Sequence, residues 1–260
     1  MSQSRIEWTE RTWNPAVGCS KVSPGCAHCY AEVMARRLQA MGVSGYENGF
    51  DVTLLPKRLN EPLLRKSPTI YFVNSMSDLF HEAIPDDYIR QVFDVIRRSP
   101  QHTFQVLTKR AERMANFFGA DQPPLNAWLG VTVEDKRFGV PRIEHLRRVQ
   151  ASVRFLSVEP LLEDLGDMDL HDIHWVIVGG ESGLKARPMK QEWVLSVKRQ
   201  CDEQGAAFFF KQWGGWGLDG KKRGKKENGR LLMGRTWDGV PAQPENRTMQ
   251  SMTHRTRITA

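Results

Sequence analysis

Short apolar runs alternate with amphipathic stretches over most of the chain. The runs cover residues 69–74, 103–108, 128–133, 153–158, 175–179 and 207–211, and stretches with helical spacing cover 31–41, 85–99, 110–118, 136–149 and 192–204. A short helix is also expected near 59–65, and 6–18 is expected to be extended. Nearly continuous apolar runs of this length are typical of parallel strands covered on both faces. We therefore predict an α/β fold of about seven strands, arranged as a partial or full (β/α) barrel.

Polar and charged residues follow the predicted strands at the points where they end. These residues are Ser75, Asp78, Lys109, Glu134, Asp135, Glu159, Glu181 and Lys211. In a parallel barrel all such positions fall on the carboxyl edge, where active sites are built. Each one alone could equally well be a helix cap or part of a surface salt bridge. Six strand ends that converge on one edge predict a functional site.

Three of the four cysteines lie in the loop between the first predicted strand and the first predicted helix. Six residues separate Cys19 from Cys26 and two separate Cys26 from Cys29, whereas Cys201 lies in a helical stretch and is expected in the core. Thiolates are soft ligands that suit zinc, copper(I) and iron–sulfur clusters. Three thiolates favour a [4Fe–4S] cluster with one iron open to a further ligand.

Structural zinc and a disulfide are the alternatives to a cluster for these cysteines. Structural zinc needs four ligands and would have to recruit His28 or the distant His81. A disulfide is disfavoured because the chain shows neither a signal-peptide pattern nor an apolar run of roughly 20 residues. These features predict a cytoplasmic protein with no membrane partner, in which thiols stay reduced.

The net charge of +7 is concentrated towards the C-terminus. Residues 211–260 carry 11 of the 37 Lys and Arg residues but only 4 of the 30 Asp and Glu residues. Such a stretch is either a solvated extension or a surface that meets a polyanion. Lys211, Trp213 and Trp216 place aromatic rings among positive charges, as in proteins that bind unpaired nucleic acid, although the tryptophans equally well cap the barrel. We predict a barrel domain at 1–213 and a basic extension at 214–260.

The three-cysteine loop, the neighbouring aromatic Tyr30 and the parallel-barrel plan resemble the radical S-adenosylmethionine (SAM) superfamily. More closely, the chain resembles a family of phage and prophage proteins of unknown function with a three-cysteine motif. The matching segments include WTERTWNPAVGCSKVSPGCAHCYAE at 8–32, NSMSDLFHE at 74–82, LGVTVED at 129–135 and VIVGGESG at 176–183. The overall plan, with serine and aspartate after the second strand, also resembles spore photoproduct lyase distantly.

Several features depart from the usual superfamily pattern. Six residues rather than three separate the first two cysteines, and the aromatic follows the last cysteine, where His28 takes the usual position before it. The Gly-Gly-Glu that commonly follows the second strand is absent there, and Ser75, Ser77 and Asp78 occupy its place.

The resemblance implies a [4Fe–4S] cluster on Cys19, Cys26 and Cys29, SAM as a second cofactor, and an external electron donor. It implies a 5′-deoxyadenosyl radical that removes hydrogen from a substrate. It also implies roles for residues at the carboxyl edge. The SAM ammonium would be bound by Ser75, Ser77 and Asp78, and the ribose by Glu134 and Glu159. Adenine would lie against Gly179 and Gly180, and the SAM carboxylate or the substrate would contact Lys109, Glu181 and Lys211.

The sequence leaves more than one function open. The favoured function is a radical SAM-type enzyme that modifies or repairs a nucleic acid or nucleotide. A partner protein associated with the same family is a further possibility. The alternative is a non-catalytic, zinc-stabilised module that binds nucleic acid or protein. A weaker third is an enzyme for a nucleotide precursor or peptide whose basic tail binds a partner. Charged groups at every strand end favour an enzyme.

Overall fold

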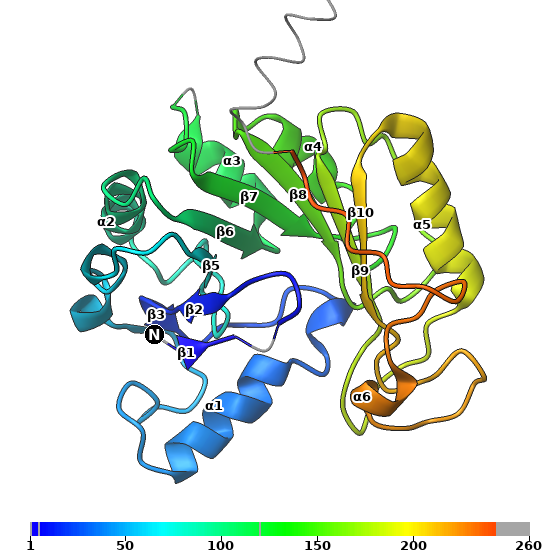
Figure 1. Ribbon diagram of the computed structural model, residues 1–260. Coiled ribbons are helices and arrows are strands. Elements are labelled where there is room, and N and C mark those ends of the chain that lie inside the picture. Colours follow the sequence, from blue (N-terminus) through cyan, green and yellow to red (C-terminus); the bar gives the residue numbers. More distant parts are fainter. Residues whose placement is uncertain (1, 5, 120, 243–260) are drawn as a thin grey trace, which may run out of the picture.

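The computed structural model describes residues 2–4, 6–119 and 121–242 (Figure 1). The strands are β1 (Ser2–Gln3), β2 (Arg11–Trp13), β3 (Ala16–Val17), β4 (Thr53–Leu54), β5 (Ile70–Val73), β6 (Thr103–Thr108), β7 (Ala127–Thr132), β8 (Val153–Val158), β9 (Trp175–Gly179) and β10 (Ala207–Gln212). The α-helices are α1 (Tyr30–Ala40), α2 (Asp86–Arg97), α3 (Ala111–Phe118), α4 (Arg142–Arg147), α5 (Gln191–Gln204) and α6 (Lys225–Asn228). Three 3₁₀ turns cover Pro24–Cys26, Pro56–Arg58 and Pro62–Leu64.

The main sheet follows the order of the chain. Its strands lie in the order β1-β2-β5-β6-β7-β8-β9-β10, and β3 pairs with β4 in a separate small sheet. All pairs from β2 to β10 are parallel, whereas β1 is antiparallel to β2. Seven parallel strands in sequence order curl into an open half-barrel, because β1 and β10 are opposite edges of the sheet (Figure 1). The predicted partial barrel is thereby confirmed.

The two faces of the sheet bury different sets of side chains, since successive residues of a strand point to opposite faces. On the outer face, Val131, Val176 and Phe210 pack in one large core with residues of α2, α3, α4 and α5. These four helices line the outside of the curled sheet, while α1 and α6 lie beyond one end of it (Figure 1). On the inner face, aromatic residues form a second cluster.

The inner cluster is built around Trp8, which the extended N-terminal segment carries across the concave face. The Trp8 ring lies 4.9 Å from Phe72 and 6.2 Å from Trp175, centroid to centroid. Its backbone carbonyl accepts a hydrogen bond from the side chain of Gln105, at 3.1 Å. Trp128 and Phe155 complete the aromatic layer. The amino end of the concave face is therefore filled, and polar residues remain at the carboxyl end.

Two predicted helices are shorter than expected. Instead of 136–149, α4 begins at Arg142, because the carbonyl of Asp135 accepts the amides of Gly139 and Val140 and its carboxylate accepts the amide of Phe138. The helix expected near 59–65 is only the 3₁₀ turn Pro62–Leu64. Proline lacks the amide hydrogen that a longer helix needs.

The basic segment after the last strand packs along β10 as far as residue 242. Asp238 forms an isolated bridge with Phe209, and the carbonyl of Trp237 accepts the amide of Phe210 at 2.9 Å. Trp175 donates its indole N–H to the carbonyl of Gly239, at 2.7 Å. The boundary at residue 213 stays a prediction, and 243–260 lie outside the described residues. In the part of the chain described, no helix combines the length and apolarity needed to cross a bilayer.

Candidate metal and cofactor site

The cysteine loop lies between β3 and α1, at the carboxyl edge of the half-barrel. Cys26 ends the 3₁₀ turn Pro24–Cys26, and Cys29 is the residue that precedes the first turn of α1. All four cysteines are free thiols; Cys19, Cys26 and Cys29 are partly exposed, whereas Cys201 is fully buried in α5. The loop therefore presents three thiols at one edge of the sheet.

The donor set of this loop consists of three thiols. Within residues 2–4, 6–119 and 121–242, no three His, Cys, Asp or Glu side chains are grouped so that they could hold one metal ion. Thiolates are soft ligands that suit zinc, copper(I) and iron–sulfur clusters. A [4Fe–4S] cluster is held by Cys thiolates, so the residue types of this loop fit three of its four irons.

Asp78, which follows β5, is saturated by hydrogen bonds from the protein itself. Oδ1 accepts from the Thr108 hydroxyl at 2.7 Å and the Phe80 amide at 3.0 Å. Oδ2 accepts from the Lys109 amide at 3.0 Å and from Arg110 Nη1 at 3.2 Å. The structure thus uses this carboxylate to join the ends of β5 and β6, which competes with its predicted contact to the SAM ammonium.

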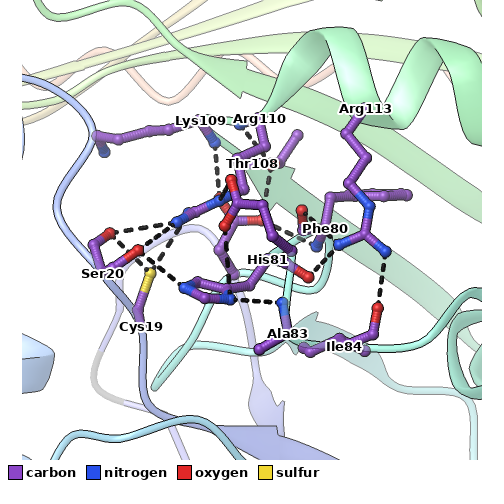
Figure 2. Close-up of polar contacts among 12 residues, drawn as sticks. Cys19, Ser20, Phe80, His81, Ala83, Ile84, Thr108, Lys109, Arg110 and Arg113 are labelled. Carbon is purple, nitrogen blue, oxygen red and sulfur yellow. Dashed lines mark hydrogen bonds and ion pairs between the residues drawn. The ribbon is translucent and has the colours of Figure 1, made fainter.

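Arg110 connects Asp78 to the cysteine loop. Its Nη1 donates to the Cys19 sulfur at 3.5 Å, and its Nη2 donates to the Ser20 hydroxyl at 2.9 Å (Figure 2). Its Nε donates to Glu82 at 2.9 Å. Burial raises the pKa of the Cys19 thiol to about 11, and Asp78 raises it further, while the nearby Arg110 guanidinium opposes both. Metal binding at Cys19 would therefore release a proton.

Glu134, which follows β7, holds the middle of the loop. Its fully buried carboxylate pairs with Arg142 Nη1 at 2.6 Å and accepts a hydrogen bond from the Ser23 hydroxyl. Burial disfavours its charged form, but the charges of Lys109 and Arg142 outweigh this and lower the pKa of Glu134. A side chain at Gly25 would come within 2.9 Å of Glu134 Cγ, so the loop approaches the carboxylate closely here.

Glu181, which follows β9, holds the end of the loop. Arg187 donates to both of its carboxylate oxygens, at 2.6 and 2.9 Å, and its Nη2 also donates to the Pro24 carbonyl at 3.1 Å. His28 Nδ1 lies 3.2 Å from Glu181 Oε2. Burial opposes ionisation, but hydrogen bonds from Arg187 lower the pKa of the Glu181 carboxyl.

Three carboxylate–arginine pairs thus fasten the cysteine loop to the ends of three different strands. The sequence predicted Asp78, Glu134 and Glu181 as direct contacts of cofactor or substrate, whereas their observed partners are the arginines and the loop. The sequence did not predict the arginines or Ser23. A signal was present in one case, because Arg110 directly follows the strand end at Lys109.

The serines after β5 are also engaged by the protein. The Ser75 hydroxyl donates to Asn14 Oδ1 at 3.2 Å, and the Ser77 hydroxyl donates to the Ala16 carbonyl at 2.9 Å. Asn74, which the sequence did not single out, has a positive φ of 57° and is 2% exposed. Within the described residues, its carboxamide N and O have no hydrogen-bond partner. A buried amide without partners is costly and is a candidate contact for a ligand.

Glu159 and Lys211 face each other across β9 at the carboxyl edge. Lys211 Nζ lies 3.1 Å from both carboxylate oxygens of Glu159. Gly179 lies between them, and a Cβ there would collide with the Glu159 carboxylate. A Cβ at Gly180 would collide with the Trp213 carbonyl, so that glycine permits close backbone packing within the protein.

We expect Gly179→Ala to displace the Glu159 carboxylate from Lys211 and lower the free energy of unfolding by about 1.5–3 kcal/mol, because a partly buried hydrogen bond between charged groups is lost. Gly224→Ala is the matched control, because its Cβ would meet nothing within 4 Å and its φ of −65° suits any residue. Urea denaturation of both variants measures the difference. Equal midpoints for the two variants would contradict this role of Gly179.

The two tryptophans predicted to contact substrate are held by the protein. Trp213 is 2% exposed, packs edge-on against Phe210 at 5.0 Å and donates its indole N–H to the Leu231 carbonyl. Trp216 is partly buried and donates to the Ala186 carbonyl at 2.7 Å. Trp213 therefore has no free face on which a base could stack, which favours the alternative that it caps the sheet.

Fold and site together define an α/β half-barrel with a three-thiol loop on its carboxyl edge. The chain belongs to the family DUF5131, which is described as "Protein of unknown function". The model of this family matches residues 3–241. No curated protein matches the chain significantly.

Solved structures of spore photoproduct lyase are similar to this chain. One point mutant has a TM-score of 0.51 at 11% identity, covering 82% of this chain and 78% of the lyase. Another mutant, with dinucleoside spore photoproduct, has a TM-score of 0.46 at 13% identity, covering 98% and 74%. A double mutant with bound AdoMet and dinucleoside spore photoproduct has a TM-score of 0.44 at 12% identity; the match covers 78% of this chain but only 64% of that lyase chain. The first comparison shows a shared fold.

Proposed function

We propose that this protein is a radical SAM-type enzyme that modifies or repairs a nucleic acid or nucleotide. The observation that carries the proposal is the set of three free, partly exposed thiols at the carboxyl edge of a seven-stranded parallel half-barrel. Cys19, Cys26 and Cys29 would hold a [4Fe–4S] cluster. When bound, the cluster and SAM supply a 5′-deoxyadenosyl radical, using one electron from an external donor.

The remaining polar residues of the edge are assigned to ligand contact. Within the described residues, Asn74 offers a buried carboxamide without a hydrogen-bond partner, and Ser75 and Ser77 follow it in the chain. Glu159 and Lys211 offer one charge of each sign. SAM carries both an ammonium and a carboxylate, so matched opposite charges suit it. The aromatic cluster around Trp8 fills the amino end of the concave face and keeps water from entering the half-barrel at that end.

Metal analysis of anaerobically purified protein tests the proposal. We expect about four irons and four sulfides per chain, a broad absorption band near 400 nm, and cleavage of SAM after reduction. One zinc per chain without iron would overturn the proposal and favour the non-catalytic binding module. If the protein binds iron but does not cleave SAM, the proposed cluster is supported and the proposed radical chemistry is overturned.

The basic segment supports a polyanionic substrate. Residues 214–242 contain seven Lys or Arg and three Asp or Glu, and Lys221, Lys225 and Lys226 are exposed. Replacing these three lysines by glutamine should reduce the slope of log K against log salt, measured with single-stranded DNA, by about 0.7 per lost phosphate contact. The double variant Lys57→Gln/Lys66→Gln, at exposed positions before β5, is the control. An unchanged slope in the triple variant would remove the segment from the nucleic-acid interface.

A phage association, a cytoplasmic location, an electron donor and a family partner protein stay predictions from the sequence. The cytoplasm is proposed because three reduced thiols on one loop suit a compartment that keeps thiols reduced.

A further inference from the structure

We propose that Arg110 is a positioning residue for Cys19, and that its hydrogen bond to the sulfur raises the reduction potential of the cluster bound there. The inference rests on the proposed function. It concerns a residue outside the cysteine motif and outside the predicted cofactor contacts.

Contacts with residues other than Cys19 fix the position of the Arg110 guanidinium. It is 8% exposed, and Asp78 and Glu82 accept from its Nη1 and Nε. Its backbone amide donates to the Thr108 hydroxyl at 2.8 Å, which in turn donates to Asp78. A planar guanidinium with several donors in a fixed arrangement can satisfy these partners and Cys19 together. The position of Nη1 beside the Cys19 sulfur is therefore set by the sheet.

A second contact fixes the residue next to Cys19. His81 Nδ1 accepts the Ala83 amide at 3.0 Å, which places the ring proton of neutral His81 on Nε2. Nε2 lies 2.8 Å from the Ser20 hydroxyl, which therefore accepts from both His81 and Arg110 (Figure 2). Cys19 is thus restrained at its sulfur and at its neighbour, before any metal binds.

The other arginines that reach the loop act differently. Arg142 reaches it through Glu134, and Arg187 donates to the backbone carbonyl of Pro24. Of these three arginines, Arg110 is the one that donates a hydrogen bond to a cysteine sulfur. An effect that requires a hydrogen bond to the sulfur should therefore be lost when Arg110 is replaced, and should persist when Arg142 or Arg187 is replaced.

Reduction adds one electron to the cluster and makes it more negative. Hydrogen bonds to the sulfurs and nearby positive charge stabilise the reduced form and so raise the potential. Loss of Arg110 removes both effects. The potential should therefore become more negative, and the cluster should be harder to reduce with the same donor.

The test compares Arg110→Gln and Arg110→Lys with Arg113→Gln. Arg113 is close to Arg110 in the chain, but it donates to the carbonyls of residues 80, 81 and 84 (Figure 2). It also donates to Asp86, and these partners all lie outside the cysteine loop. Anaerobic redox titration with dithionite gives the potential. We expect Arg110→Gln to lower the ratio of reduced to oxidised cluster at least tenfold at a fixed potential, which is a shift of about 59 mV for one electron. Arg113→Gln should leave the ratio unchanged, with Arg110→Lys between them.

A second readout does not depend on the cluster. Because Arg110→Gln leaves Asp78 without its cation, the double variant Asp78→Asn/Arg110→Gln removes the unpaired charge and protects folding. In the metal-free chain, amide hydrogen exchange of residues 18–26 should be faster in Arg110→Gln and in the double variant than in Arg113→Gln. Equal exchange and equal potentials would overturn the inference. If the wild type binds no iron, the proposed function fails, and hydrogen exchange alone decides whether Arg110 positions the loop.

Discussion

Replacing Cys19, Cys26 or Cys29 by alanine is expected to abolish cluster binding and SAM cleavage. Each thiolate would hold a different iron, so removal of any one of them leaves an iron without its protein ligand. SAM cleavage should fall more than about 100-fold, beyond the effect of losing a residue that only supports a ligand. Iron and sulfide content, the band near 400 nm and a SAM cleavage assay measure the loss.

Cys201→Ala is the control for those three variants. Cys201 is fully buried in α5, far in sequence from the loop, so it should keep full iron content and lose about 1 kcal/mol of stability. Loss of iron in Cys201→Ala, or full iron in any of the other three, would contradict the assignment of the ligands.

Arg142→Ala is expected to lower the free energy of unfolding by about 3–5 kcal/mol, because it leaves a buried carboxylate without its cation. Glu134 is fully buried and its Oε2 lies 2.6 Å from Arg142 Nη1. Arg142 also donates to the Thr132 carbonyl at 2.7 Å, so the end of β7 loses a second contact. Guanidinium denaturation measures the effect.

The paired replacement separates charge from packing. Glu134→Leu combined with Arg142→Met should recover most of the stability, because a buried ion pair exchanged for apolar residues is often neutral. A double variant that is as unstable as Arg142→Ala would contradict the unpaired charge as the cause of the loss.

Acid should act on the same pair. The folded pKa of Glu134 is below its ordinary value of 4.5, so the ionised carboxylate stabilises the fold above that pH and the contribution is lost as pH falls through the lowered pKa. In Glu134→Gln this loss should be absent. Denaturation midpoints measured between neutral pH and strongly acid pH would show it.

The alternation of apolar runs was sufficient to predict the sheet. β6, β8 and β9 match the predicted runs in full, because strands buried on both faces leave a continuous apolar signature. The start of α4 and the short turn at Pro62 were mispredicted, because local hydrogen bonds to Asp135 and the missing proline amide decide them. Spacing alone does not report such contacts.

The sequence predicted charged residues at the carboxyl ends of the strands but not their arginine partners. Asp78, Glu134 and Glu181 follow β5, β7 and β9, and each pairs with an arginine. Their predicted contacts to a cofactor or substrate stay predictions. The arginine partners could not be predicted because pairing depends on how the folded chain brings the side chains together. Asn74 was missed because a lone asparagine after a strand carries no pattern, and its burial and unpartnered amide are visible only in three dimensions.

The contacts of Trp8 have a consequence for the order in which the chain folds. This tryptophan, near the start of the sequence, packs against Phe155 of β8 and Trp175 of β9. During synthesis it emerges long before those partners exist. Contacts between residues so distant in the sequence form slowly, because a large loop must close first. The N-terminal segment therefore completes the interior late, and a nascent chain that ends before β9 should expose an indole that the finished protein buries.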